Sequence, residues 1–185
     1  MSTHPELTIR LATLDDVELL EPLIAESVRV LQAPDYTASQ REAALGTVFG
    51  VDRQLILDRT YFVAEIDGVI VGCGGWSRRR TLFGSDHQAG REDALLDPVM
   101  DAAKIRAFFV LPGYERRGIG SAIMRASEEA AAAEGFTRLE LRSTLTGVAL
   151  YRAHGFVEAE KEEIPLTSGG TLPTVPMFKE LRRNG

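Results

Sequence analysis

The feature that most constrains this fold is a short apolar strand followed, across a glycine-containing loop, by a long amphipathic helix. Residues 104–110 (KIRAFFV) have the composition of a strand, and Pro112-Gly113 ends the run. Gly118 opens the helix and Gly135 ends it. Between them, apolar residues recur at the spacing of one helix face: Ile119, Ala122, Ile123, Ala126, Ala130 and Ala133. The segment therefore indicates a domain that mixes α and β structure.

The loop between this strand and helix has the geometry of an anion site. Several unpaired backbone N–H groups would point at one spot, with the positive end of the helix dipole behind them. Gly118 and Gly120 lack Cβ atoms, so a ligand such as a pyrophosphate can approach the backbone closely. A plain tight turn, without a ligand, is the alternative interpretation of these two glycines.

Two widespread phosphate motifs do not fit this loop. No Lys-Ser or Lys-Thr pair follows the glycines, which argues against a P-loop nucleotidase. Ile123 stands where a dinucleotide-binding motif would have its third glycine.

The first sixty residues predict one strand and two or three helices. Residues 8–11 alternate in polarity as a strand does. Thr13 precedes a helix that Pro34 ends, with apolar residues at helical spacing: Val17, Leu20, Ile24, Val28 and Leu31. Ser39 is placed to cap a second helix, and residues 51–58 form a short third segment.

A hairpin and a long loop are predicted next. Residues 61–66 and 69–73 flank Asp67-Gly68, a dipeptide that favours a type I′ turn. Residues 77–102 are polar and contain glycine, and they are too many for an ordinary connection. Loops of this length usually bind ligands or move.

The last third of the chain predicts further alternation of strand and helix. We expect strands at residues 136–142, 156–164 and 175–181, a short helix at residues 145–154, and a turn at residues 168–170. There are no internal repeats. The order of elements indicates one mixed α/β domain over residues 1–185.

The charge of the chain is unevenly distributed. Its formal net charge is −6, which argues against a nucleic-acid partner. Residues 104–118, however, carry four basic side chains and one acidic side chain, a net charge of +3. This local positive potential can attract a small anion even though the whole chain is acidic.

Several other classes of protein are not expected. The single cysteine, Cys73, excludes an internal disulfide framework and a cysteine-rich zinc site, and we expect it to be a small buried residue. No set of His, Asp and Glu has the spacing of metal ligands. No apolar stretch approaches the roughly 20 residues that span a bilayer. Residues 1–10 lack the layout of a signal peptide, so we expect a cytoplasmic protein.

Two motifs, in this order, resemble the GNAT superfamily of N-acetyltransferases. The first is Phe109-Val110 at a strand end, followed by Arg116-Arg117-Gly118-Ile119-Gly120-Ser121 at the helix start. The second is Leu150-Tyr151-Arg152-Ala153-His154-Gly155-Phe156. The resemblance covers residues 61–165. Two positions depart from it: Glu115 stands where the family has Gln or Arg, and Thr146 stands where many members have Asn.

The resemblance implies a single-domain GNAT fold. Its central sheet would have about six or seven strands, mostly antiparallel, flanked by helices and splayed at the strand that binds the cofactor. Residues 1–60 would supply a strand and the helices on the acceptor side. Residues 61–110 would form the sheet with an inserted loop at 77–102, and residues 111–185 the half that binds acetyl-CoA.

The resemblance also implies acetyl-CoA as cosubstrate, without a metal, and gives roles to named residues. The backbone amides of the loop would bind the pyrophosphate: Arg116, Arg117, Gly118, Ile119, Gly120 and Ser121. The backbones of Phe109 and Val110 would hydrogen-bond the pantetheine arm, and the Val110 N–H would also polarise the thioester carbonyl. Thr146 would lie near the pantetheine arm or the thiol. Tyr151 would protonate the departing CoA thiolate.

The acceptor is less defined. The implied reaction is direct attack of a primary amine, from a small molecule or a peptide, on acetyl-CoA in a ternary complex. The first two helices and the 77–102 loop would form its site. Candidate general bases are Glu26, Asp86, His87 and Asp101, with a chain of waters as an equal alternative. Arg78-Arg79-Arg80 would meet an acidic acceptor or the 3′-phosphate of CoA.

Two other functions remain open at this point. One is a non-catalytic acyl-CoA-binding sensor or interaction module on the same fold, and the other is a structural protein in which the glycines merely turn the chain. Tyr151 favours the enzyme, because only catalysis needs a proton donor at that position. The resemblance also allows a homodimer.

Overall fold

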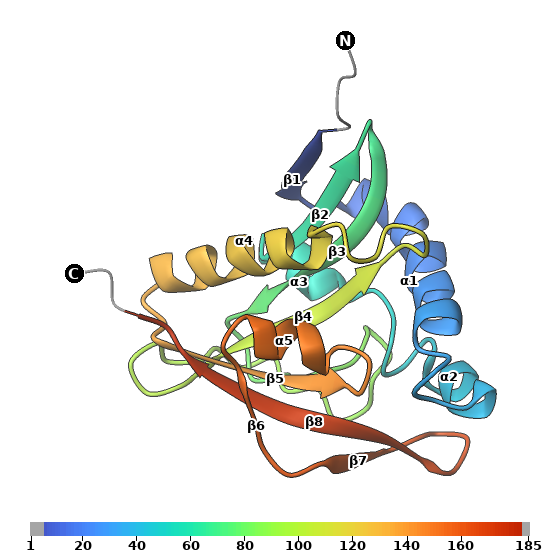
Figure 1. The fold of residues 1–185 in the computed structure, drawn as a ribbon. Helices are drawn as coiled ribbons and strands as arrows, with labels where there is room; N and C mark the ends of the chain where they lie inside the picture. The colour runs from blue at the N-terminus through green and yellow to red at the C-terminus, as the bar shows by residue number, and fades with distance from the viewer. Residues whose placement is uncertain (1–5, 183–185) are drawn as a thin grey trace.

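The computed structural model describes residues 6–182, and in these residues one sheet contains all eight strands (Figure 1). The strands are β1 (Leu7–Leu11), β2 (Tyr61–Ile66), β3 (Val69–Ser77), β4 (Ala103–Val110), β5 (Arg138–Thr144), β6 (Val157–Glu158), β7 (Glu162–Pro165) and β8 (Thr171–Glu180). Their order is β1-β2-β3-β4-β5-β8-β6, and β7 also pairs with β8. Among the strands within residues 6–182, only the β4–β5 pair is parallel. The predicted mixed α/β fold with a mostly antiparallel sheet is confirmed, with one strand more than the predicted six or seven.

Helices cover both faces of the sheet. One face carries the 3-10 turn η1 (Leu14–Asp16) with α1 (Val17–Leu31), α2 (Ala38–Ala44) and α3 (Arg53–Leu57). Their core includes Leu20, Ile24 and Leu55, which are at most 1% exposed. The other face carries α4 (Ile119–Ala133) and α5 (Val148–Ala153), whose core includes Met124 and Tyr151. Figure 1 shows α4 crossing in front of the central strands, with α3 behind them.

The second helix begins two residues earlier than predicted. Thr37, and not Ser39, is its N-cap: the Thr37 hydroxyl accepts a hydrogen bond from the Gln40 N–H (3.1 Å). The Gln40 side chain in return accepts from the Thr37 N–H (3.0 Å). This reciprocal arrangement satisfies two backbone donors, which the lone hydroxyl of Ser39 cannot do.

The predicted hairpin is confirmed, and its second strand continues to Ser77. Asp67 and Gly68 have φ of 51° and 77°, as a type I′ turn requires. Two glycines of β3 allow neighbours to approach its backbone. A Cβ at Gly72 would lie 2.6 Å from Ile119 of α4, and one at Gly74 would lie 2.7 Å from the Phe108 ring. Gly72 therefore sets how closely the start of α4 lies against the sheet, and Gly74 leaves room for the Phe108 ring.

The strand predicted at residues 156–164 is divided into β6 and β7. Both pair with β8, where Glu158 lies opposite Met177 and Glu162 opposite Thr174. Four residue steps on one side therefore match three on the other, as at a β-bulge. The prediction of one continuous strand was wrong because the sequence pattern does not show this extra residue.

The parallel strands β4 and β5 pair over a very short distance. They pair at Ala103–Leu139 and Lys104–Glu140, and then they separate. Beyond Lys104, β5 continues to pair with β8 on its other side. The splay predicted at this strand is therefore present, and it opens the sheet from Ile105 to Val110.

A bulge turns β4 where the sheet opens. The register with β3 moves from Gly75–Arg106 to Cys73–Phe109, so β4 uses one residue more than β3. Ala107 takes a left-handed φ of 56°, a conformation that costs an alanine roughly 1 kcal/mol. The buried Tyr61 donates a hydrogen bond from its hydroxyl to the Ala107 carbonyl (2.8 Å), which fixes the strained residue.

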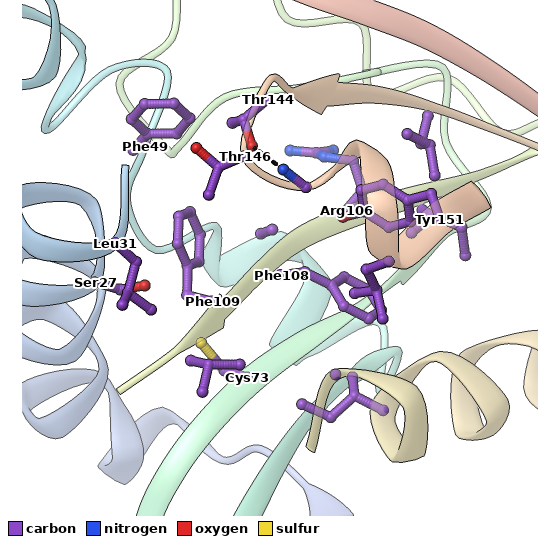
Figure 2. A pocket seen from close by; sticks show the side chains of 18 of the residues that line it. Ser27, Leu31, Phe49, Cys73, Arg106, Phe108, Phe109, Thr144, Thr146 and Tyr151 are labelled. Atoms are coloured by element: carbon purple, nitrogen blue, oxygen red, sulfur yellow. Dashed lines mark hydrogen bonds between the residues drawn. The ribbon is translucent and has the colours of Figure 1, made fainter. Parts of the chain in front are cut away.

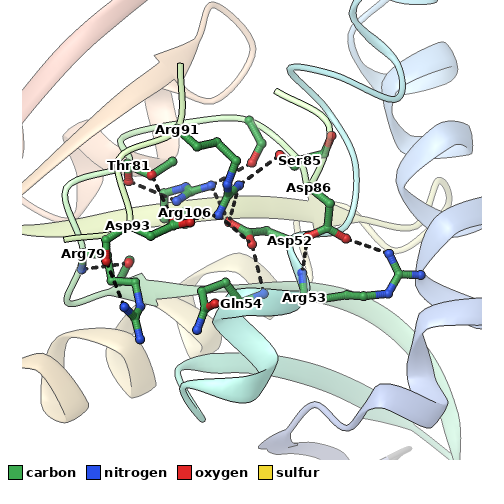
Figure 3. A network of polar contacts seen from close by, with 12 residues as sticks. Asp52, Arg53, Gln54, Arg79, Thr81, Ser85, Asp86, Arg91, Asp93 and Arg106 are labelled. Atoms are coloured by element: carbon green, nitrogen blue, oxygen red, sulfur yellow. Dashed lines mark hydrogen bonds and ion pairs between the residues drawn. The ribbon is translucent and has the colours of Figure 1, made fainter. Parts of the chain in front are cut away.

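A buried ion network holds the long loop between β3 and β4 against the sheet (Figure 3). Arg106, 3% exposed, contacts the carboxylate of Asp52 (2.9 Å) and donates to the carbonyls of Thr81 and Gly84. Arg91 also donates to Asp52, at 3.1 and 3.2 Å. Asp52 caps α3 as well, so one carboxylate joins a helix, a strand and the loop.

The arginine cluster of this loop does not reach a ligand site. Arg79 forms an ion pair with Asp58 (2.6 Å), and Arg78 forms one with Glu134 (2.6 Å). The expectation that Arg78, Arg79 and Arg80 meet an acceptor or a phosphate is not supported, because none of them lines the cavity described below.

Asp52→Asn tests whether this network stabilises the fold. Loss of the Asp52 charge leaves Arg106 buried without its partner, so the free energy of unfolding should fall by about 3–5 kcal/mol. Urea denaturation measures this change. Glu42→Gln is the matched control, because the Arg29–Glu42 pair has both side chains 55% exposed and should matter little. Equal unfolding midpoints for the two variants would contradict the role of the network.

Candidate active site

A cavity of about 440 Å³ lies at the gap between β4 and β5 (Figure 2). Side chains from both faces of the sheet line it. From the face of α4 and α5 come Ile119, Gly120, Ser121, Leu150 and Tyr151; from the opposite face come Ser27, Leu31, Gln32, Phe49, Phe83 and Phe109. Because the gap joins the two faces, two ligands can enter from opposite sides of the sheet and meet inside it.

The backbone of β4 presents a free amide to this gap. Leu111 N–H donates to Val71 O (2.8 Å), so this pair is a hydrogen-bonded pair of the β3–β4 ladder. Pairs alternate in an antiparallel ladder, which makes Gly72–Val110 the pair without mutual hydrogen bonds. The N–H and C=O of Val110 therefore point away from β3 and toward the gap. Those of Phe109 point to β3, which disagrees with the prediction that the Phe109 backbone bonds the pantetheine arm. The Phe109 side chain forms part of the cavity wall.

The start of α4 directs several amides toward the same cavity. Ala122 N–H donates to Gly118 O (2.9 Å), the first bond of the helix, so the N–H groups of residues 118–121 have no partner within it. Gly118 has φ of 79° and Arg116 has φ of 62°, and these left-handed residues bend the loop. The exposed Arg116 and Arg117 add positive charge there. The loop can therefore hold an anion.

Glu115, the acidic residue next to Arg116 and Arg117, is held within the loop by a hydrogen bond. Its carboxylate accepts a hydrogen bond from the Gly113 N–H (2.6 Å). Arg117 stacks over the Tyr114 ring, 4.9 Å from its centroid. The departure from the family pattern at Glu115 thus has a structural role in shaping the loop.

Tyr151 lies in the wall of the cavity, held by aromatic neighbours. Its ring makes edge-to-face contacts with Phe108 and Phe156, with centroids 6.0 and 5.9 Å away. Its hydroxyl forms no hydrogen bond with another residue in the part of the chain that the structure describes. Burial raises the pKa of Tyr151 well above its usual value near 10, so the phenol stays protonated at neutral pH.

Thr146 also lines the cavity, but its hydroxyl is engaged. It donates to the carboxylate of Asp35 (2.7 Å), in the segment between α1 and α2. The nearby Tyr36 makes a second connection: its hydroxyl donates to Pro173 O (2.6 Å) and accepts from Leu145 N–H (2.9 Å). These bonds tie the end of α1 to β8 and to the loop before α5, which closes this side of the cavity.

The four candidate bases do not reach the cavity wall. Asp86 forms an ion pair with Arg53 (2.6 Å), and Asp101 accepts from the Asp97 N–H (2.8 Å). Glu26 and His87 are exposed, and none of the four lines the cavity. Cys73 does line it, fully buried as predicted, but burial raises its thiol pKa to about 12. Cys73 is therefore a poor nucleophile at neutral pH.

His154 ends α5, as expected, and lies beside the first turn of α4. Its Nε2 lies 3.0 Å from the Ser121 hydroxyl. Burial lowers the pKa of His154, so the neutral ring is favoured at pH 7.

Sequence reasoning missed most of the wall opposite α4. Gln32, Phe49, Phe83 and Arg142 come from four separate segments and carry no motif. The length of the 77–102 loop was the one available signal, and it correctly indicated that the loop contributes to the site through Leu82, Phe83 and Gly84.

Within residues 6–182, no group of three or more His, Cys, Asp or Glu residues is arranged to hold a metal ion. None of the helices in this range is long and apolar enough to cross a membrane. The prediction about a signal peptide concerned residues 1–10, and residues 1–5 lie outside the described residues.

Several solved structures share this fold. A GCN5-related N-acetyltransferase from Rhodopseudomonas palustris has 22% sequence identity and a TM-score of 0.69, with 98% of each chain covered. The PaiA N-acetyltransferase of Thermoplasma acidophilum, solved with coenzyme A, has 15% identity and a TM-score of 0.66, covering 95% of this chain and 99% of its own. At these identities the likeness shows the fold alone.

A third structure contains the cosubstrate expected from the sequence. The putative acetyltransferase YncA of Salmonella typhimurium, solved with acetyl-CoA, has 15% identity and a TM-score of 0.63, covering 97% of this chain and 96% of its own. No curated protein matches the sequence. Residues 25–156, which include both motifs and most of the cavity wall, match the model of the acetyltransferase (GNAT) family, and the chain belongs to this family.

Proposed function

We propose that this chain transfers an acetyl group from acetyl-CoA to a primary amine, by direct attack within a ternary complex. The observation that carries the proposal is the cavity at the β4–β5 gap, lined from both faces of the sheet and facing the free amide of Val110. Related folds solved with coenzyme A and with acetyl-CoA support the choice of cosubstrate.

Acetyl-CoA binds on the face of α4. The amides from Arg116 to Ser121 hold its pyrophosphate, where the helix dipole and two arginines favour negative charge. The pantetheine arm then follows the open side of β4, bonding the Val110 backbone as an added strand would. Phe109 contributes its side chain to the wall, and Thr146 lies beside the arm.

The reaction needs two groups from the protein. The amine nitrogen attacks the thioester carbonyl carbon, and the oxygen gains negative charge that the Val110 N–H stabilises. The carbon–sulfur bond then breaks, and the CoA thiolate takes a proton from Tyr151. The new amide nitrogen releases its extra proton to solvent, and solvent returns a proton to the Tyr151 phenolate. A phenol with a raised pKa is still protonated when the thiolate forms, as a general acid must be.

The amine binds on the face of the sheet opposite α4, among α1, the segment between α2 and α3, and the loop at residues 77–102. This places acceptor recognition in residues 1–60 and 77–102, and acetyl-CoA binding in residues 111–185. None of the four candidate bases lines the cavity, so the amine reaches the thioester after losing its proton to water.

A non-catalytic acyl-CoA-binding module is the alternative function. It would need the α4 amides and the gap but no proton donor. Tyr151, protonated and in the wall of the cavity, favours the enzyme. A panel of amines, amino acids, aminoglycosides and peptides, tested with acetyl-CoA for release of free thiol, separates the two. Tight acetyl-CoA binding without thiol release from any acceptor would favour the module.

Gly120→Asp tests the phosphate site. A carboxylate among the α4 amides would repel the pyrophosphate, so the acetyl-CoA Kd should rise at least about tenfold relative to Gly120→Asn. Both side chains meet Leu150, 3.0 Å from the added Cβ, so the comparison isolates charge. Calorimetry at two salt concentrations measures the difference, which should shrink at high salt. Equal Kd values would show that the phosphates bind elsewhere.

Tyr151→Phe tests the proton donor. The ring and its packing remain, so acetyl-CoA should bind with an unchanged Kd, whereas kcat should fall about a hundredfold. Steady-state thiol release measures kcat. In the wild type, the raised Tyr151 pKa predicts that deprotonation of the phenol lowers kcat only above pH 10. Full turnover by Tyr151→Phe would remove the role.

A further inference from the structure

The acceptor half of the cavity is mainly apolar. Phe49, Phe83 and Phe109 line it, and the rings of Phe49 and Phe109 meet edge to face with centroids 6.0 Å apart. Leu31, Val48 and Ile164 add aliphatic surface. Against such walls, the few polar groups decide which ligand fits.

Gln32 supplies the first of these polar groups. It lies at the C-terminal end of α1, is 5% exposed and lines the cavity. Its Oε1 is buried and has no hydrogen-bond partner within the described residues. Buried amide oxygens are nearly always satisfied, so this one indicates a donor that arrives with a ligand.

Arg142 supplies the second polar group, from β5. Its guanidinium lies over the Phe83 ring, 5.7 Å from the centroid. Its Nη1 contacts Glu162 (2.6 Å), which is 53% exposed and does not line the cavity. Its buried Nε has no partner in residues 6–182. Nε and Nη2 form the other edge of the guanidinium, which can bind both oxygens of a carboxylate.

We propose that Gln32 and Arg142 recognise an acceptor that carries both an amine and a carboxylate, namely a free amino acid with an apolar side chain. This inference rests on the proposed function and names its substrate class. Gln32 Oε1 accepts a hydrogen bond from the amine, and the free edge of Arg142 binds the carboxylate. The apolar side chain of the acceptor lies against Phe49 and Phe83.

Charge and size agree with this class. Arg106 also lines the cavity, but the buried Asp52 and two loop carbonyls occupy its guanidinium. Arg142 pairs through Nη1 with the half-exposed Glu162, which leaves its Nε–Nη2 edge for a ligand. A simple monoamine would bring a second positive charge next to Arg142, whereas an amino acid brings a compensating carboxylate. The cavity of about 440 Å³ must also hold the thioester, which favours a small acceptor.

Matched acceptor pairs test the proposal. Phenylalanine, leucine and methionine are compared with the amines that lack only their carboxylate, by thiol release from acetyl-CoA. Wild-type kcat/KM should be at least about tenfold higher for each amino acid. Arg142→Gln should abolish that preference while the acetyl-CoA Kd stays unchanged. Arg29→Gln, in an exposed pair with Glu42, is the control and should keep the preference.

Gln32→Leu separates recognition from a structural role. Leucine replaces the unsatisfied amide with an apolar group of similar size, so the urea midpoint should stay the same or rise. Amino acid binding should weaken at least about tenfold, measured by calorimetry on protein saturated with CoA. A structural role for Gln32 would instead lower the urea midpoint and leave amino acid affinity unchanged.

Three results would overturn the proposal. Carboxylate-free amines could be acetylated as fast as the amino acids, Arg142→Gln could retain the preference, or no amino acid could bind the CoA-saturated protein. In each of these cases acetyl transfer to other amines would leave the proposed function standing. Absence of acetyl-CoA binding and of thiol release with every acceptor would instead refute the proposed function itself.

Discussion

The site depends on one constraint: β4 and β5 stop pairing after Lys104. Backbone groups inside a protein are almost always hydrogen-bonded, so strands that part leave donors and acceptors that another partner must satisfy. At Val110 the amide that would have joined the two strands faces a cavity instead. The opening therefore removes stability from the sheet and leaves a hydrogen-bond donor that the proposed reaction would use.

Polar contacts on both sides hold the gap open. On the β4 side, Arg106 is fixed by Asp52 and by loop carbonyls, and the adjacent Ala107 is fixed in its strained conformation by Tyr61. On the β5 side, Tyr36 bridges Leu145 and Pro173. Burial raises the Tyr36 pKa to about 12, so its hydroxyl remains a donor at neutral pH. These contacts fix the positions of β4 and β5 on either side of the gap.

How much of the fold could be predicted from the sequence depends on how far apart in the chain the interacting residues lie. Asp67-Gly68, the Gly118 loop and the apolar face of α4 are local signals, and each led to the right element. The N-cap at Thr37 was missed although its capping box with Gln40 is local. The division of residues 156–164 depends on register with β8, and the pairing of Arg79 with Asp58 joins distant segments, so composition could not show either one.

The two faces of the gap differ in the same way. The proposed cofactor face is built from one continuous segment, α4 with its loop, and from α5 soon after it, so motifs of fixed spacing describe it. The proposed acceptor face combines α1, the segment between α2 and α3, the inserted loop and β5, and no spacing relates them. Its atoms without a hydrogen-bond partner in residues 6–182, Gln32 Oε1 and Arg142 Nε, lower the stability of the fold. Polar groups that reduce stability in this way are expected where a ligand is recognised, because the ligand restores the missing bonds.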